Sequence, residues 1–149
     1  VAVAVLMGLC SCQTTEWPDL EANWECTTQW TWDNDGKSVP CSYVARASGK
    51  DNVTRTTGVL SLGDAQWDET TQSTYRIDGD KMCGTRTVTK NTPSNDAARE
   101  FEREHTDGKS IAANAMKPHD YCFQLIKKSE GKFTVKDDAE GRLTTCVRL

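Results

Sequence analysis

The sequence lacks an apolar run long enough to cross a bilayer, and it lacks an excess of basic residues. A membrane-spanning helix needs about 20 apolar residues, whereas the apolar run at the start of the chain covers only residues 1–9. The 18 basic residues are outnumbered by 22 acidic ones, the formal charge is -4, and no basic stripe is present. We therefore expect neither a membrane-spanning helix nor a nucleic-acid partner.

The sequence also lacks the short motifs that mark common catalytic and metal sites. It has no CxxC pair, no GxSxG, no HExxH and no phosphate-binding loop. Zinc-ribbon, thioredoxin-like, serine-hydrolase and zincin interpretations therefore have no support. The 22 acidic residues are spread along the chain, so any glycosidase-type pair chosen from them would be arbitrary. These absences favour a non-catalytic protein, with no cofactor and no bound metal.

The chain begins instead with a segment typical of export. Residues 1–9 are apolar and uncharged, and their number matches the apolar core of a signal peptide, about 7–15 residues. Leu9-Cys10-Ser11-Cys12 follows the lipobox order, with an aliphatic residue three positions before a cysteine and a small residue immediately before it. In this respect the segment resembles bacterial lipoproteins, although these usually have a small residue where this chain has Cys10.

The resemblance implies that Cys12 carries a lipid and that the membrane is a partner through this anchor. Gln13 follows Cys12, and in lipoproteins of bacteria with two membranes such a residue, rather than aspartate, implies the outer membrane, facing the periplasm. Plain secretion and a buried N-terminal strand are the alternatives. We expect a signal segment over residues 1–12, a polar tether over 13–22 and a single β-rich domain over 23–149.

Five further cysteines fit an exported domain. They are Cys26, Cys41, Cys83, Cys122 and Cys146. In an oxidising compartment such thiols are expected to form disulfides. Their spacing does not define which cysteines pair, and an odd number leaves one thiol free or bonded to another molecule.

Alternation of polar and apolar residues predicts a mainly β, antiparallel fold. Trp24, Cys26, Trp30 and Trp32 fall on one face of a strand over residues 23–32. A glycine-containing turn and a return strand complete the clearest hairpin. The return strand is expected over residues 39–46, and further strands are expected over residues 53–62, 73–77, 81–90, 121–127, 133–136 and 143–149. This spacing predicts a meander barrel or a sandwich.

A helical insertion near residues 93–117 interrupts the predicted strands. Pro93 is expected at the first helical position. Apolar residues then recur at helical spacing over 97–105 among charged residues, which indicates a surface helix. A second short helix is expected over 109–117.

The last predicted hairpin carries a second resemblance. It reads Phe133-x-Val135-x-Asp137 and then Gly141-x-x-Thr144-x-Cys146-x-Arg148. This pattern is similar to the last hairpin of small lipocalin-like envelope lipoproteins. The similarity covers this hairpin alone, agrees with a β-meander and identifies no family.

Aromatic residues supply the candidate ligand-binding face. Each tryptophan can bury roughly 150–250 Å². The candidates are Trp24, Trp30, Trp32, Trp67 and Tyr75. Inside a barrel these side chains would line a cavity for a small apolar ligand, and on the surface they would bind a sugar or a partner protein. The favoured alternative is that they fill the core of a domain that has few large aliphatic residues.

A cluster of histidine, carboxylate and thiol residues keeps two other function classes open. The cluster comprises His105, Asp107, His119, Asp120 and Cys122. These residue types bind metals or form a thiol nucleophile, but their spacing matches no short ligand pattern. The function classes are an exported, non-catalytic binding or accessory protein, a secreted inhibitor or partner-binding domain, and a hydrolase or metal protein that uses His105, His119 and Cys122.

Overall fold

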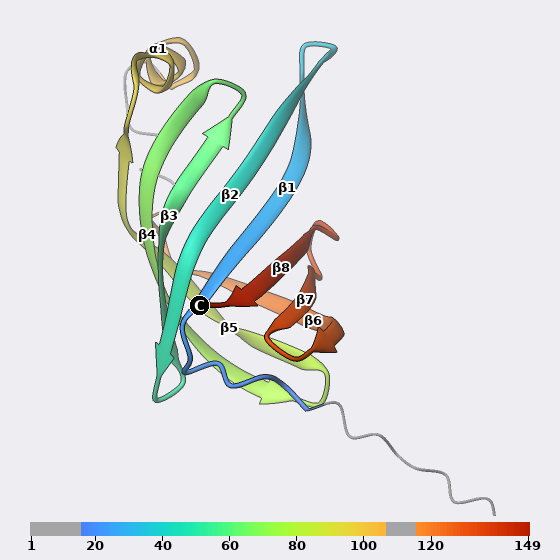
Figure 1. Cartoon of the computed structure of the whole chain (residues 1–149). Helices are drawn as coiled ribbons and strands as arrows, with labels where there is room; N and C mark the ends of the chain where they lie inside the picture. Colours follow the sequence, from blue (N-terminus) through green and yellow to red (C-terminus); the bar gives the residue numbers. More distant parts are fainter. Residues whose placement is uncertain (1–15, 107–115) are drawn as a thin grey trace, which may run out of the picture.

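The computed structural model, which describes residues 16–106 and 116–149, shows a closed β-barrel (Figure 1). Its antiparallel strands follow one another in sequence order, and the last pairs with the first. The strands are β1 (Trp24–Asn34), β2 (Lys37–Lys50), β3 (Val53–Leu62), β4 (Ala65–Asp78), β5 (Lys81–Pro93), β6 (His119–Ser129), β7 (Lys132–Asp137) and β8 (Leu143–Arg148). One helix, α1 (Asp96–His105), lies between β5 and β6. The predicted mainly β meander barrel with a helical insertion is confirmed.

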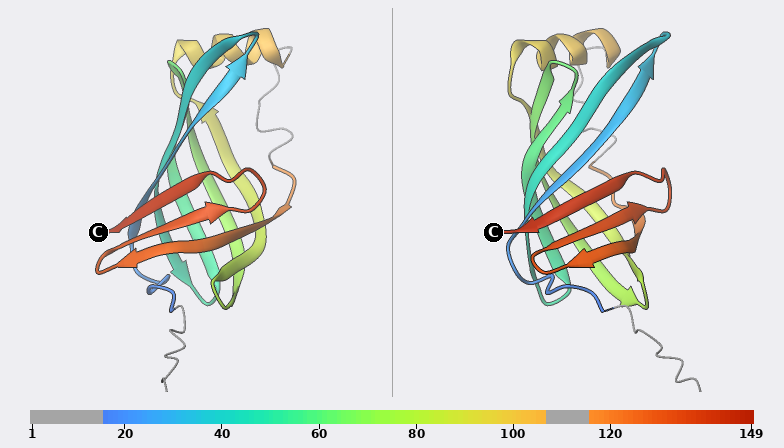
Figure 2. Two further views of the ribbon diagram at one scale, coloured as in Figure 1. Left: turned by 90° about the vertical axis from the view of Figure 1, so that its right-hand side faces the viewer. Right: turned by 45° about the vertical axis from the view of Figure 1, so that its right-hand side comes forward.

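The barrel is assembled from a long and a short sheet. Strands β1–β5, the long sheet, have 10 to 14 residues each, whereas β7 and β8 of the short sheet β6–β8 have 6 each. β1 pairs with β8 only over residues 24–28, and β5 pairs with β6 only over residues 81–86. The long strands therefore continue beyond the short sheet toward α1, as Figures 1 and 2 show.

The apolar core is divided between two ends of the barrel. At the short-sheet end the buried residues are Trp24, Leu125, Phe133, Val135 and Cys146. At the helix end they are Ala65, Trp67 and Ala98, with Phe101 packed against them. Between the two clusters several inward positions of β4 are polar, and they include Glu69, Thr71 and Ser73, all buried. The interior therefore has a polar middle.

Residues 16–22 cover the short-sheet end of the barrel. Trp17 and Leu20 pack against the apolar cluster there. The indole N–H of Trp17 donates to the carbonyl oxygen of Gly79 at 3.0 Å, and that of Trp24 donates to the carbonyl oxygen of Asp19 at 2.9 Å. The segment expected as a polar tether over 13–22 is thus packed on the domain from residue 16 on.

The helix begins later than the sequence predicts. Pro93 is the last residue of β5 rather than the first of the helix. Asn95 is the N-cap, and its side chain accepts a hydrogen bond from the backbone N–H of Ala98 at 2.9 Å. The same side chain donates to the carbonyl oxygen of Asp64 at 2.8 Å, which ties the start of the helix to the β3–β4 turn. Most of the second helix expected over 109–117 lies outside the described residues.

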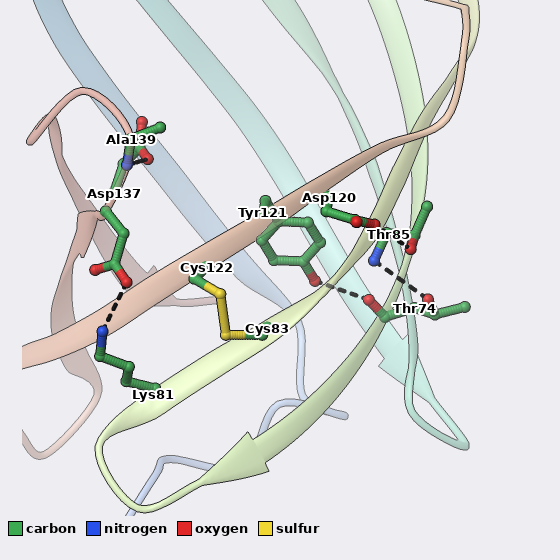
Figure 3. Close-up of a disulfide and its surroundings, with 10 residues drawn as sticks. Thr74, Lys81, Cys83, Thr85, Asp120, Tyr121, Cys122, Asp137 and Ala139 are labelled. Carbon is green, nitrogen blue, oxygen red and sulfur yellow. Dashed lines mark hydrogen bonds and ion pairs between the residues drawn. A yellow bond between two sulfur atoms is a disulfide. The ribbon is translucent and has the colours of Figure 1, made fainter.

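Each seam between the long and the short sheet carries one disulfide. Cys26 and Cys146 are direct cross-strand partners where β1 meets β8. Cys83 and Cys122 are likewise direct cross-strand partners, bonded where β5 meets β6 (Figure 3). Cys41 is free and buried. Four of the five candidate cysteines are therefore paired, and Cys41 is the odd thiol.

Within the described part of the chain, no helix is both long and apolar enough to span a membrane. The signal segment and Cys12 lie outside the described residues.

Candidate functional site

The polar middle of the barrel is centred on the carboxylate of Glu69. Glu69 lies two residues after the fully buried Trp67 on β4, and alternation along the strand places both side chains inside, Glu69 with only 8% of its surface exposed. Its Oε1 accepts from Nη2 of Arg86 at 3.4 Å, and its Oε2 accepts from Nδ2 of Asn91 at 3.0 Å. One buried carboxylate thus binds two side chains of β5.

A β-bulge explains how Arg86 and Asn91 come to face the same interior. They are an odd number of residues apart, so a regular strand would place them on opposite faces. The pairing of β4 with β5 shifts at Thr70 and Thr71, which leaves Thr89 as the extra residue of β5. The hydroxyl of Thr89 donates to the carbonyl oxygen of Thr70 at 3.1 Å. The bulge changes the alternation and turns Asn91 inward beside Arg86.

The guanidinium of Arg86 reaches across the interior from β5 to β2. Its Cζ lies 5.8 Å from the ring centroid of Tyr43, a cation–π arrangement. The hydroxyls of Tyr43 and Thr56 lie 3.5 Å apart, and Thr56 is hydrogen-bonded in turn to Thr71. The four successive strands β2, β3, β4 and β5 are therefore joined by one polar network inside the barrel.

Two buried atoms of this network have no hydrogen-bond partner among the described residues. They are Nε of Arg86, a donor, and Oδ1 of Asn91, an acceptor. Leaving such a group unpaired costs about 1–3 kcal/mol, so buried polar atoms normally meet protein, water or ligand. The side chain of Arg86 as a whole keeps 31% of its surface exposed, although its Nε is buried.

The phenols around the network are neutral hydrogen-bonding groups. Burial raises the pKa of Tyr43 above its ordinary value, while the hydrogen bond with Thr56 acts in the opposite direction. The pKa of Tyr121 is raised to about 12, mainly by burial, and the positive charge of Arg86 acts in the opposite direction. The hydroxyl of Tyr121 donates to the carbonyl oxygen of Thr74 at 3.0 Å, as Figure 3 shows. Both phenols stay protonated near neutral pH, which suits binding by hydrogen bonds.

Two of the five aromatic candidates are core residues. Trp24 packs edge-on against Phe133, with 4.8 Å between ring centroids. Trp67 packs edge-on against Phe101 at 5.5 Å, and its indole N–H donates to Glu102. These residues belong to opposite ends of the barrel, so the predicted aromatic face is not one continuous site.

The other three aromatic candidates are half-buried. Trp32 meets the ring of His105 on α1 at 6.2 Å between centroids. Trp30 lies under the guanidinium of Arg142, whose Cζ is 4.4 Å from its ring centroid. Burial raises the pKa of Tyr75. Trp30 and Trp32 lie on the part of β1 that extends past β8.

A shallow groove runs across the first three strands. It has a volume of about 520 Å³, and its lining residues are Gln29, Trp30, Pro40, Cys41, Ser42, Ser61 and Gly63. Gln29, Ser42 and Ser61 form one cross-strand row, and they alternate with the inward-facing Trp30 and Cys41. Among the aromatic candidates, Trp30 alone lines this groove.

The structure does not assemble His105, His119 and Cys122 into one site. His105 is in the last turn of α1, and its ring stacks on Phe101 with 4.1 Å between centroids. His119 is exposed at the start of β6, and Cys122 is bonded to Cys83. A disulfide sulfur offers no thiolate to a metal or a substrate.

The two carboxylates of that candidate cluster, Asp107 and Asp120, do not form a site with the histidines in the described residues. Asp120 accepts a hydrogen bond from the hydroxyl of Thr85 at 3.0 Å, and Asp107 lies outside the described residues. Over residues 16–106 and 116–149, no three histidine, cysteine, aspartate or glutamate side chains gather in a group that could hold a metal ion.

The fold and the polar network place this chain in the structural class of closed, antiparallel meander barrels, here with a polar interior. No protein-family model matches the sequence, and no curated protein matches it either.

Sequence reasoning missed the residues of this polar network. Glu69 stands at an alternate position between Trp67 and Tyr75, but the polar residues at 69, 71 and 73 remove the contrast in hydropathy that marks a strand. A carboxylate between two aromatic positions of one strand face is a candidate buried charge. Asn91 had no comparable signal, since its inward position depends on the bulge.

Proposed function

We propose that this chain is an exported, non-catalytic binding protein whose barrel interior holds a small, uncharged polar molecule. One observation carries the proposal. Nε of Arg86 and Oδ1 of Asn91 are both buried and unpaired among the described residues, and both side chains are fixed by the carboxylate of Glu69. A donor and an acceptor held in place and left without partners are the polar groups expected of a ligand site.

The charges and hydrogen-bonding groups define the chemistry of the ligand. Glu69 already balances the charge of Arg86, so a second net charge in the interior would be disfavoured. A ligand that satisfies both unpaired atoms must offer an acceptor to Nε of Arg86 and a donor to Oδ1 of Asn91. A lactam or a primary amide offers both on adjacent atoms. The polar lining therefore favours such a molecule over the purely apolar ligand that the tryptophans alone suggest.

Export is supported by the two disulfides, because such bonds persist in oxidising compartments. We further propose an envelope location, with a lipid on Cys12 and, from Gln13, the outer membrane facing the periplasm. The support for this part of the proposal is the lipobox-like sequence alone.

The test follows the side-chain Nε–H resonance of Arg86 in the full exported chain during titration with 2-pyrrolidinone, a lactam. We expect a saturable shift. N-methyl-2-pyrrolidinone has no donor and is expected to bind about 2- to 10-fold more weakly, the effect of one lost hydrogen bond. Asn91→Ala is expected to remove this difference between the two probes.

Asn23→Ala is the matched control, because Asn23 is exposed just before β1. It is expected to keep the preference for the lactam. The proposal fails if neither probe gives a saturable shift, which would leave water as the partner of the two atoms. It also fails if both probes bind equally to the unaltered protein.

A further inference from the structure

The outward side of β7 and β8 carries lysines paired with exposed aliphatic side chains. The buried residues of these two strands are Phe133, Val135 and Cys146. Alternation along each strand therefore turns the residues between them outward. Lys132 lies directly opposite Val147, and Lys136 lies directly opposite Leu143. Each of these two lysines thus has an aliphatic neighbour across the strand pair.

A third lysine and a third aliphatic residue stand together on β6. The pairing of β6 with β7 shifts between Leu125, which is buried, and Lys127. Ile126 is the extra residue of this bulge and is 50% exposed. Lys127 pairs with Thr134, an outward residue of β7. The residues 126, 127, 132, 136, 143 and 147 together form what we call the lysine face.

The aliphatic members of the lysine face are unusually exposed. Leu143 is 52% exposed and Val147 is 48% exposed. With Ile126 and the C-terminal Leu149, they are the four most exposed large apolar residues in the described part of the chain. All four therefore belong to the short sheet or to the residue that follows it.

The lysine face is positive on a chain whose formal charge is -4. None of its three lysines is in an ion pair within residues 16–106 and 116–149. The remaining outward residues of β7 and β8 are Thr134 and Thr145, which are uncharged. The three ammonium groups are therefore free to meet negative charges outside the barrel.

The carboxylates around the lysine face are mostly balanced by basic residues. The neighbouring pairs are Glu25 opposite Arg46, Asp138 with Lys81, and Glu140 with Arg142. Glu130 in the β6–β7 turn adds one negative charge against the three lysines. The face therefore keeps a positive charge.

The chain enters the domain beside this face. The ammonium of Lys128, the residue after Lys127, donates to the carbonyl oxygen of Glu16 at 2.9 Å. Figures 1 and 2 show the segment that begins at residue 16 passing below the short sheet. Glu16 is four residues after Cys12, so their Cα atoms are at most about 14 Å apart. A lipid on Cys12 would therefore hold this part of the short sheet close to a bilayer.

We propose that the lysine face rests on an anionic phospholipid surface. The proposal rests in part on the lipid proposed for Cys12, while the charge and the exposed aliphatic residues stand independently of it. Ammonium groups are attracted to anionic headgroups, and the aliphatic side chains enter the interface between the headgroups and the acyl chains. A lipid anchor combined with a basic patch gives two attachments, which together also fix the orientation of the domain.

The composition of the face favours lipid over a protein partner. Protein interfaces are enriched in aromatic residues and arginine, and they are depleted in lysine. The outward positions of β7 and β8 hold two lysines and neither an aromatic residue nor an arginine. Lysine also carries a long alkyl chain, which lies along an apolar surface while its ammonium reaches the headgroups. An acidic protein surface is the alternative occupant that the test must exclude.

The first test compares the partitioning of the full exported chain onto two kinds of vesicle, phosphatidylcholine alone and phosphatidylcholine mixed with phosphatidylglycerol. We expect a clear preference for the mixed vesicles. The triple variant Lys127→Gln, Lys132→Gln and Lys136→Gln is expected to lose roughly 100-fold of this preference, because each lysine near an anionic surface contributes about fivefold. Near-ultraviolet circular dichroism checks that each variant is folded.

The matched control is the triple variant Lys37→Gln, Lys90→Gln and Lys117→Gln. It changes the net charge by the same amount, and its three lysines are exposed outside the lysine face. It is expected to keep most of the preference for the mixed vesicles. An equal loss in both triple variants overturns the proposal, because net charge and not this face would then govern binding.

The second test asks whether the face enters the interface. Val147→Cys is labelled with a nitrobenzoxadiazole dye, whose emission shifts to the blue in an apolar environment. We expect a blue shift on the mixed vesicles. Gln72→Cys is the control, because residue 72 is exposed on β4, and its emission is expected to stay unchanged. Equal shifts at both positions, or none at residue 147, overturn the proposed orientation.

The anchor and the face are separated by the choice of vesicle. Intact mass and binding to phosphatidylcholine alone report the lipid on Cys12, and the absence of both overturns the anchor. The ratio of partitioning between the two vesicle types reports the face with or without that lipid. A ratio of one for the unaltered chain overturns the proposal and leaves an acidic protein surface as the occupant to test.

Discussion

The indole N–H of Trp67 donates a hydrogen bond to Oε1 of Glu102, with 3.0 Å between the two atoms. Trp67 has no exposed surface on β4, and Glu102 is only 9% exposed on α1. The ring of Phe101 packs edge-on against the same indole. A buried polar contact within an apolar cluster thus fixes the position of α1 at the end of the barrel.

Replacing Glu102 with leucine is expected to lower the free energy of unfolding by about 1–3 kcal/mol, because the buried indole N–H loses its acceptor. Glu102→Gln keeps an oxygen that can accept the indole N–H, so this variant is expected to lose less stability. Urea denaturation followed by tryptophan fluorescence measures both. Glu104→Leu on the same helix is the control, since Glu104 is exposed. An equal loss in this control would show that the helix, and not the hydrogen bond, determines the effect.

The two disulfides are expected to contribute similar stability. Cys26 and Cys146 are 120 residues apart, and Cys83 and Cys122 are 39 apart. The loss of chain entropy in the unfolded state corresponds to about 5 and about 4 kcal/mol for loops of these lengths. A domain of this size is stable by only about 5–15 kcal/mol. Loss of both bonds is therefore expected to bring the chain close to unfolding.

Paired alanine variants of each disulfide, compared by urea denaturation without reductant, check this expectation. Cys41→Ala serves as the control, because it removes a buried sulfur without removing a cross-link. Cys41→Ala is expected to lower the free energy of unfolding by less than the removal of either disulfide. Unchanged stability after full reduction of the unaltered protein would contradict a structural role for the bonds.

The sequence predicted the strands that alternate in polarity, and it failed where the inward residues are themselves polar. β3 has the predicted bounds, 53–62. β4 was expected only from residue 73, but it begins at Ala65. Glu69 and Thr71 occupy inward positions there, so the strand face shows no contrast in hydropathy. Periodicity finds a strand only when burial and polarity agree.

Barrel closure and disulfide pairing had no local signal. Both depend on Cys26 meeting Cys146, residues far apart in the sequence that become neighbours only through the register of β1 with β8. The helix start was misplaced for a different reason. Pro93 and Asn95 are both acceptable start signals, and the hydrogen bond from Asn95 to Asp64 that decides between them is a tertiary contact.

Cys41 is expected to resist alkylation in the native protein. Its thiol is buried, donates to the carbonyl oxygen of Val39 at 3.5 Å, and has a pKa raised by that burial. Thiolate is the reactive form, so a raised pKa lowers its fraction at mildly alkaline pH. N-ethylmaleimide labelling followed by peptide mapping is expected to show Cys41 unlabelled when folded and labelled in urea.

Ser48→Cys supplies the matched control for this experiment, because residue 48 is exposed on the same strand. The introduced thiol is expected to react at once in the folded protein. Equal labelling rates of Cys41 and the residue 48 thiol would contradict the burial of Cys41.

Tyr121 is expected to make stability fall with rising pH in the alkaline range. Its pKa is raised to about 12 by burial, whereas a phenol in an unfolded chain ionises near pH ~10. Between these values the unfolded state has lost the proton and the folded state still holds it. The unfolded state therefore binds fewer protons, and the free energy of unfolding decreases as pH rises through this window. Below about pH 10 both states are protonated and the dependence disappears.

Tyr121→Phe tests this expectation because it removes the ionising group and keeps the ring. The ring lies opposite Gly84, where a Cβ would collide with the carbonyl oxygen of Thr74, the atom that accepts the hydrogen bond from the Tyr121 hydroxyl. Loss of that hydrogen bond is expected to cost about 1 kcal/mol at neutral pH. The variant should nevertheless lose less stability than the unaltered protein as pH rises from about 10 to about 12. Parallel denaturation curves across this range would show that Tyr121 ionises alike in both states and is not shielded by the barrel.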